Sequence, residues 1–562
     1  HGISVMSCLS VHQIWFFTVM MTGIFAMDGP VFQTQYGAVR SMSVDEGVIV
    51  LGLPFGQPPV DALRWKAPEP FNTPWAPSIR DGSVPGPACP RKGCGPKDAD
   101  SQHVCPRDGK LSEDCLYLNI FAPHTIANST NKLPVLFWLH GGGFDSGTGS
   151  ALSYDGRFLA NKTNTVVVTT NYRLGALGFL VAGEGKDAAT GNYGILDQIL
   201  ALKWVQQNIG SFGGDKNHVT IVGQSAGADS IGIHMTNNRS TGLFEKAIML
   251  SLPFTINHKS HFEAVRLGNH FAGLLNCTHG DMTCIRSKTT DELLDAQDKS
   301  HNFIANPFRL FEMFVQWGPY IDGDVLAEEL VDRFAKGQFH KMPFIIGTVT
   351  EEARPYVYGA FSNSMSKLEL DGVAVAFLGG KAERVIREYH PPQTSDYRPY
   401  LSHAVTDWVF TCPTRNASRN AIVSGETDVW LSVFDHSWSF KHAWGDSTYC
   451  DGHVCHGENV PFVFQTPPLA NITLTPDEQV MADTIAYHYG NFAHTGDPNK
   501  HDQHLMSPKI NMSDILNWPK YNSDNLYTIL NITTPENTLI QNYRQEKCDF
   551  WDRENVYNRG RK

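Results

Sequence analysis

The sequence GQSAG at residues 223–227 has the G-x-S-x-G pattern that places a serine on a sharp turn. It directly follows the β-branched run VTIV at residues 219–222, and residues 226–234 after it have the composition of a helix. A strand–turn–helix context exposes the serine hydroxyl, here that of Ser225, without crowding side chains. We therefore expect Ser225 to be a nucleophile, which needs a general base and an oxyanion site at neutral pH.

The sequence HGGGF at residues 140–144 is the candidate oxyanion element. Glycines let backbone N–H groups approach a developing oxyanion closely, and the order of the two motifs is the order that this chemistry uses. We expect the donors to be the amides of Gly142, Gly143 and Ala226. A plain glycine-rich turn after a strand is the alternative interpretation, and it does not explain the order of the two motifs.

Buried strands must position both motifs. Residues 134–140, 165–171 and 219–222 are short apolar runs, which are typical of strands buried on both faces. Between the second and third runs, residues 195–209 carry apolar side chains at helical spacing. This order predicts an α/β fold with a doubly wound, mostly parallel sheet and helices on both faces.

Composition excludes several classes of protein. The chain has 562 residues, of which 41% are hydrophobic and 18% charged, so it is neither disordered nor fibrous. The net charge is −12 and no run of Lys or Arg stands out, which makes nucleic acid a poor candidate partner. Length alone would predict three or four domains.

Residues 1–26 resemble a signal peptide, because residues 14–26 are mostly apolar, carry no charge and are short for a membrane span. An uncleaved anchor is the alternative, and Met6 is a possible start. The polar residues 553–562 predict no C-terminal membrane span. Eight glycosylation sequons support a secreted or lumenal glycoprotein; they are at Asn128, Asn161, Asn238, Asn276, Asn416, Asn471, Asn511 and Asn531.

The cysteine count agrees with an oxidising compartment. Of 11 cysteines, Cys8 lies in the expected leader, and the remaining ten allow up to five disulfides. Spacing indicates two local loops, Cys277–Cys284 and Cys450–Cys455, and leaves the other pairings open. Residues 450–456 also have ligand-like spacing of Cys, His and Asp, but pairing of the two cysteines is favoured over a zinc site, and we expect no metal.

Two long segments resemble one family. Residues 212–227 (FGGDKNHVTIVGQSAG) resemble the serine signature of the type-B carboxylesterase/lipase, or cholinesterase-like, family, and residues 113–120 (EDCLYLNI) match its second signature. The likeness extends from about residue 30 to residue 552. It implies one α/β-hydrolase domain over residues 27–562, in place of the several domains predicted from length. It also implies a serine carboxylic ester hydrolase without a cofactor.

The resemblance assigns the acid and the base. Residues 350–353 (TEEA) resemble the family's K-D-E-G, which places the acid at Glu352; Glu351 is the alternative by one position. Residues 454–458 (VCHGE) place the base at His456. The order Ser225, Glu352, His456 is that of α/β-hydrolases. The resemblance also implies three disulfides, and the remaining cysteines complete the set: Cys89–Cys115, Cys277–Cys284 and Cys412–Cys548, then Cys94–Cys105 and Cys450–Cys455.

Substrate preference is the least determined property. A quaternary ammonium site is disfavoured, because no aromatic residue lies between Cys89 and Cys115 and neutral Gln224 stands where the family has an acid. Met313 and Val315 occupy positions where acetyl-selective members carry bulky aromatics, which favours larger acyl groups; simple core packing is the alternative. A cholinesterase and a non-catalytic adhesion or structural relative remain the alternative functions, and the natural ester and oligomeric state stay open.

Overall fold

The computed structural model describes residues 27–94, 105–106, 108–127, 131–307, 309–426, 428–440, 444–445, 447–501 and 515–557. The expected signal peptide, residues 1–26, lies outside this part of the chain.

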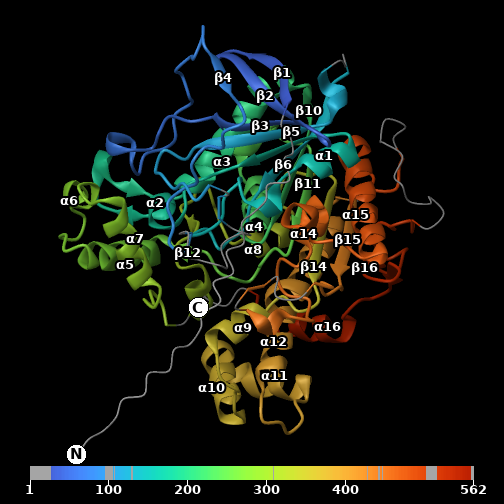
Figure 1. The fold of residues 1–562 in the computed structure, drawn as a ribbon. Helices are drawn as coiled ribbons and strands as arrows, with labels where there is room; N and C mark the ends of the chain where they lie inside the picture. Colours follow the sequence, from blue (N-terminus) through green and yellow to red (C-terminus); the bar gives the residue numbers. More distant parts are fainter. Residues whose placement is uncertain are drawn as a thin grey trace, which may run out of the picture.

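One large twisted sheet forms the centre of the molecule (Figure 1). Its seven central strands, from β7 to β16, are parallel, while the strands on both flanks are antiparallel. The spatial order is β1 (Met27–Thr34), β2 (Gly37–Val44), β3 (Gly47–Pro54), β5 (Tyr117–Ala122), β7 (Val166–Thr170), β6 (Leu133–Leu139), β10 (Gly214–Gln224), β11 (Lys246–Leu250), β14 (Phe344–Val349), β15 (Val429–Phe434), β16 (Ile529–Ile532) and β17 (Thr538–Ile540). The short strand β4 (Ile79–Asp81) pairs with β2.

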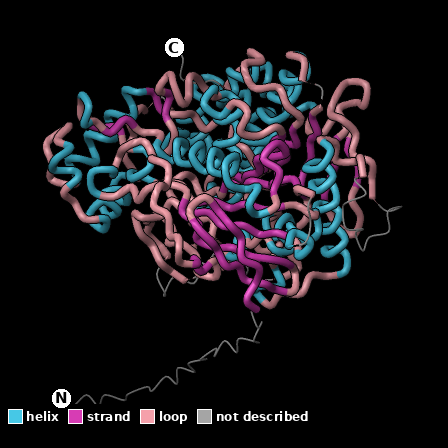
Figure 2. Tube along the Cα trace, turned by 90° about the horizontal axis from the view of Figure 1, so that it is seen from above, coloured by secondary structure: helices cyan, strands magenta, loops and turns pink. Residues whose placement is uncertain are grey.

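The central strands are buried because helices cover both faces of the sheet (Figure 2). Alternate residues of each strand enter different cores: Phe137 of β6 belongs to one and Trp138 to the other. The first core contains residues of α3 (Tyr193–Asn208), α4 (Ala226–Thr236), α8 (Leu330–Ala335) and α13 (Cys412–Val423). The second contains residues of α1 (Arg157–Thr163), α14 (Val460–Phe464) and α15 (Pro476–Thr495).

These elements confirm the predicted fold class. The apolar runs at residues 134–140, 165–171 and 219–222 are β6, β7 and β10, and the expected crossover helix is α3, which leads from β7 to β10. β6 lies between those two strands in the sheet. The fold is that of an α/β-hydrolase, with a mixed and mostly parallel sheet.

Two groups of helices lie away from the sheet (Figure 1). One group is α5 (His261–Leu274), α6 (Met282–Arg286) and α7 (Thr290–Ser300). The other is α9 (Arg354–Ala360), α10 (Lys367–Leu378), α11 (Ala382–Tyr389) and α12 (Arg398–Thr406), at the bottom of the view. The remaining α-helices and strands of the described residues are α2 (Gly175–Phe179), α16 (Gln545–Glu554), β8 (Val181–Ala182), β9 (Ala189–Thr190), β12 (Lys259–Ser260) and β13 (Tyr320–Ile321).

Five disulfides stabilise the loops and the C-terminal helix. Four close loops of 26 residues or fewer, whereas the fifth joins α13 to α16 across 136 residues. The pairs are Cys89–Cys115, Cys94–Cys105, Cys277–Cys284, Cys412–Cys548 and Cys450–Cys455. Within the described residues no helix is long and apolar enough to cross a membrane. The five disulfides fit a secreted or lumenal protein.

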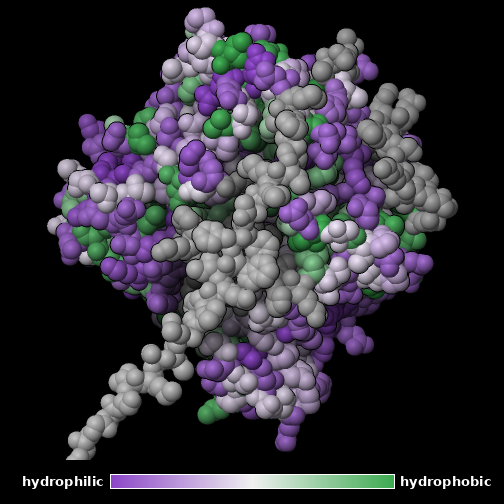
Figure 3. Space-filling view, in the orientation of Figure 1, coloured by the Kyte–Doolittle hydropathy of each residue, from purple (hydrophilic) through white to green (hydrophobic). Residues whose placement is uncertain are grey.

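Polar residues dominate the described part of the face in Figure 3, where hydrophobic residues form small separate groups. The apolar side chains are instead concentrated in the cores on the two faces of the sheet.

Candidate active site

Ser225 stands on a strained turn between β10 and α4. Its backbone has φ +57° and ψ −124°, a conformation that costs energy for any residue with a side chain. The turn fits against β6 only because Gly227 lacks a Cβ atom, which would lie 2.0 Å from the carbonyl oxygen of Leu139. The residue pattern and the tight packing therefore form the sharp turn that the G-x-S-x-G motif predicts.

Glu352 and His456 lie together at the same edge of the sheet. The Nδ1–H of His456 donates a hydrogen bond of 2.5 Å to Oε2 of Glu352. The other oxygen of Glu352 accepts from the backbone N–H of Val349, the last residue of β14, at 2.8 Å. Glu352 is fully buried, so both of its oxygens are held away from bulk water.

The neighbouring carboxylate of Glu351 points to other partners. It accepts hydrogen bonds from Nδ1 of His453 at 2.9 Å and from Arg354 at 3.1 Å. The backbone of Glu351 also pairs with the loop closed by the Cys450–Cys455 disulfide, because its N–H donates to the carbonyl oxygen of Val454. The structure therefore places Glu352, and not Glu351, against His456. The sulfurs of Cys450 and Cys455 are bonded to each other, so they are not the zinc ligands that the spacing of residues 450–456 also allowed.

Nε2 of His456, the atom that would act as general base, contacts another side chain of the cavity in this structure. The side-chain amide of Gln224 donates to Nε2 of His456 at 3.0 Å. Ser225 lies beside Tyr356, whose ring centre is 5.4 Å from that of His456. Burial, together with the charge of Glu352, raises the pKa of Tyr356 well above its usual range. With Nδ1–H donating and Nε2 accepting, His456 has the tautomer that a general base needs.

The glycine-rich loop after β6 has backbone angles that favour glycine. Gly142 has φ +110° and Gly143 has φ +60°. The N–H and the hydroxyl of Ser146 both donate to the carbonyl oxygen of Gly142, which closes the loop into a tight turn. His140 stacks on Tyr172 beneath this loop, and burial lowers the pKa of its imidazole to about 4, so it is neutral.

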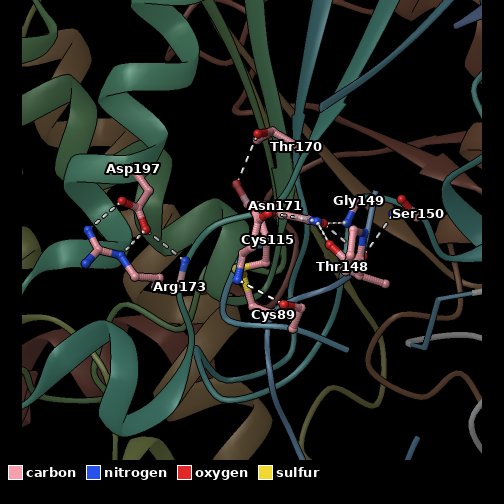
Figure 4. Close-up of a disulfide and its surroundings, with 12 residues drawn as sticks. Cys89, Cys115, Thr148, Gly149, Ser150, Thr170, Asn171, Arg173 and Asp197 are labelled. Atoms are coloured by element: carbon pink, nitrogen blue, oxygen red, sulfur yellow. Dashed lines mark hydrogen bonds and ion pairs between the residues drawn. A yellow bond between two sulfur atoms is a disulfide. The ribbon is translucent and has the colours of Figure 1, made fainter. Parts of the chain in front are cut away.

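Asn171 anchors the end of the same loop (Figure 4). Its side-chain oxygen accepts hydrogen bonds of 2.9 Å from the hydroxyl of Thr148 and from the N–H of Gly149. Its amide donates to the carbonyl oxygen of Cys115, next to the Cys89–Cys115 disulfide. The disulfide loop and the glycine-rich loop are thus connected through one side chain at the end of β7.

A cavity of about 730 Å³ brings the expected residues together. Ser225, His456 and Gln224 line it, as do Gly142, Gly143, Ala226 and Val315. The side chain of Met313 lies outside the described residues. Glu352 lies behind His456 and is not part of the wall.

Three features of this cavity were not predicted from the sequence. Trp438 and Trp444 stack at 5.1 Å and form one wall. Tyr356 contacts both Ser225 and His456. Asp229 lines the cavity one helical turn after Ser225. This spacing is the one feature of the sequence that could have predicted the position of Asp229 in the cavity.

The glycosylation sequons differ in exposure. Asn238, Asn276 and Asn471 are exposed, and Asn161 and Asn416 are half-buried. Asn531 is buried in β16, where its amide donates to Thr538 at 3.0 Å. Asn128 and Asn511 lie outside the described residues. The exposed asparagines are therefore the best-placed acceptors.

Comparison with known proteins confirms the likeness over nearly the whole chain. The model of the carboxylesterase family matches residues 28–551. The cAMP-regulated D2 protein of Dictyostelium discoideum is 37% identical over 475 residues, which are 84% of this chain and 85% of its own. The crystal protein of the same organism is 34% identical over 520 residues, 92% of this chain and 89% of its own. The para-nitrobenzyl esterase of Bacillus subtilis (strain 168) is 32% identical over 512 residues, 90% of this chain and 95% of its own. The chain belongs to the carboxylesterase family.

Proposed function

We propose that this protein is a secreted serine carboxylic ester hydrolase with the triad Ser225, Glu352 and His456. The observation that carries the proposal is the 2.5 Å hydrogen bond between buried Glu352 and His456. His456 lines the same cavity as Ser225, which stands on a strained turn. The family and the Bacillus relative, named as an esterase, support the reaction class.

The proposed chemistry is that of a serine esterase. Ser225 Oγ attacks the ester carbonyl carbon while Nε2 of His456 accepts the hydroxyl proton, and Glu352 stabilises the imidazolium that forms. The backbone amides of Gly142, Gly143 and Ala226 donate to the oxyanion. His456 returns the proton to the leaving alcohol, and water then releases the acid from the acyl-enzyme by the same route.

One rearrangement precedes this cycle. Nε2 of His456 must exchange the amide of Gln224 for the hydroxyl of Ser225, which lies beside Tyr356. All four side chains line the cavity, so a bound ester contacts them directly. We propose that substrate binding drives the exchange, with Val315 and Met313 bounding the acyl group.

The leader, the sequons and the disulfides support the proposed compartment. We propose that residues 1–26 direct the chain into the secretory pathway, where the five disulfides form. The exposed asparagines at 238, 276 and 471 are the proposed glycan acceptors.

The test is hydrolysis of a panel of p-nitrophenyl esters by the purified protein and by Ser225→Ala. We expect Ser225→Ala to lose at least about a thousandfold in kcat while the thermal unfolding midpoint stays close to that of the parent. Ser447→Ala, which alters a second serine on the cavity wall, is the matched control and should keep most of the activity. Full turnover by Ser225→Ala would refute the assignment.

A second candidate function is a non-catalytic relative that uses the cavity for binding. The observation in its favour is that Nε2 of His456 accepts a hydrogen bond from the side-chain amide of Gln224. Absence of turnover for every ester, together with absence of covalent labelling of Ser225 in folded protein, would favour this candidate.

A further inference from the structure

The cavity beside Ser225 has one charged wall that the proposed mechanism does not use. Asp229 lies on α4 and its N–H donates to the carbonyl oxygen of Ser225 at 2.9 Å. With a helical rise of 1.5 Å per residue, the two Cα atoms lie about 6 Å apart. Asp229 lines the cavity and is 8% exposed. The carboxylate of Asp229 therefore lies close to the site where an ester carbonyl would bind.

His258 holds this carboxylate in place. Its Nε2 lies 3.2 Å from Oδ2 of Asp229, and its Nδ1 lies 2.9 Å from Oε2 of Glu329. Ionised carboxylates only accept hydrogen bonds, so both ring nitrogens must carry a proton. Burial lowers the pKa of His258, but the two carboxylates raise it more, to about 10. One imidazolium is thus shared between two carboxylates.

The other cations near this wall are engaged elsewhere. Arg309 donates to Glu329 at 2.8 Å, to Glu263 at 2.7 Å and to the carbonyl oxygen of His258 at 2.7 Å. Nζ of Lys259 donates to the carbonyl oxygen of Val315 at 2.7 Å. Among the described residues, hydrogen bonds reach the carboxylate of Asp229 only through Oδ2. Oδ1 is the acceptor that remains for a ligand in the cavity.

We propose that Oδ1 of Asp229 binds a protonated amine of the substrate, which makes esters with an ammonium N–H the preferred class. The inference rests on the proposed function, because it assumes that an ester binds at Ser225. A charged N–H donor is favoured because hydrogen bonds between ions are stronger than neutral ones. A quaternary ammonium has no N–H, so this site differs from an aromatic choline site.

The test measures binding to Ser225→Ala protein, which does not require turnover. Two matched pairs place the charge on either side of the ester: 2-(dimethylamino)ethyl acetate against 3-methylbutyl acetate, and ethyl 3-(dimethylamino)propanoate against ethyl 4-methylpentanoate. In at least one pair at about pH 7, the amine should bind at least about tenfold more tightly than its neutral isostere. Acetylcholine should bind more weakly than 2-(dimethylamino)ethyl acetate. If each amine bound no more tightly than its neutral isostere in both pairs, the proposal would be overturned.

Substitutions then assign the preference to one residue. In the Ser225→Ala background, Asp229→Asn should remove most of the difference in affinity between the preferred amine and its neutral isostere. Asp145→Asn is the matched control, because Asp145 is a second cavity carboxylate, paired with His301 at 3.1 Å. An equal loss in both variants would contradict a specific role for Asp229. Hydrolysis of the neutral esters by the unsubstituted protein reports the proposed function separately, so the two ideas can fail independently.

Discussion

At the scale of single residues, the candidate site depends on two positions with unusual backbone requirements. Ser225 has positive φ, and Gly227 accepts the close approach of β6. The acid could not be assigned from the sequence pattern alone, because Glu351 and Glu352 are adjacent. Their side chains differ in partner: one reaches His453 and the other His456.

The two candidate oxyanion glycines allow a matched prediction. A Cβ atom on Gly142 would lie 2.5 Å from the carbonyl oxygen of Ser146, whereas on Gly143 the nearest atom is 3.8 Å away, on Asp145. Gly142→Ala must therefore displace the loop, and we expect it to lower kcat by at least about a hundredfold. Gly143→Ala should lower kcat by a smaller factor. Steady-state hydrolysis of p-nitrophenyl butyrate compares them, and equal losses would argue against this description of the loop.

At the scale of elements, strand ends bring the site together. β6 precedes the glycine-rich loop, β10 precedes Ser225 and β14 precedes Glu352, all at the carboxyl edge of the parallel strands. The position of the site at this edge could be predicted, because the apolar runs and the motifs are adjacent in sequence. The antiparallel strands β1–β3 and the helices α9–α12 were not predicted, because they lie outside the segments that carry the catalytic motifs.

The Cys450–Cys455 disulfide closes the loop directly before His456. Loop-closure entropy assigns it about 2 kcal/mol of stability. Replacing both cysteines by Ser should therefore lower the unfolding midpoint modestly but reduce kcat strongly, because the imidazole loses its fixed position. The double Ser variant of Cys277 and Cys284 is the control: its loop is of similar length and lies in the α5–α6 segment. Equal activity in the two double variants would show that the disulfide does not position His456.

The His258 network predicts a pH dependence of stability. The pKa of folded His258 is about 10, above its ordinary value of 6.5. Its stabilisation is therefore complete below about pH 6.5 and is lost as the pH rises towards 10. The nearby pKa of Lys259 is lowered to about 8, mainly by burial, and that of Glu312 is raised to about 8, also mainly by burial, so both titrate in the same range.

Chemical denaturation of the parent and His258→Gln isolates the contribution of His258. The free energy of unfolding of the parent should decrease between pH 6.5 and 10 more steeply than that of His258→Gln. Parallel curves would show that the imidazole is not held as a cation.

The pairing of Asp229 with His258 could not be predicted, because residues 29 positions apart meet only through the packing of α4 against the segment before β12.

At the scale of the whole molecule, two cores on opposite faces of one sheet support the site, and α16 is tied to this body by Cys412–Cys548. The bond joins residues 136 positions apart. Loop-closure entropy assigns such a link about 5 kcal/mol. Replacing both cysteines by Ser should lower the unfolding midpoint more than loss of Cys450–Cys455 does, while activity at low temperature is retained. The reverse order of stability losses would contradict this assignment.

The central claim is that Ser225 is an activated nucleophile in the folded protein. The most direct measurement is labelling of the purified native protein with a fluorophosphonate probe, followed by peptide mapping. We predict a single adduct on Ser225 that is absent from the Glu352→Gln and His456→Ala variants and from denatured protein. Folded protein that shows no adduct, or an adduct only on another residue, would contradict the claim.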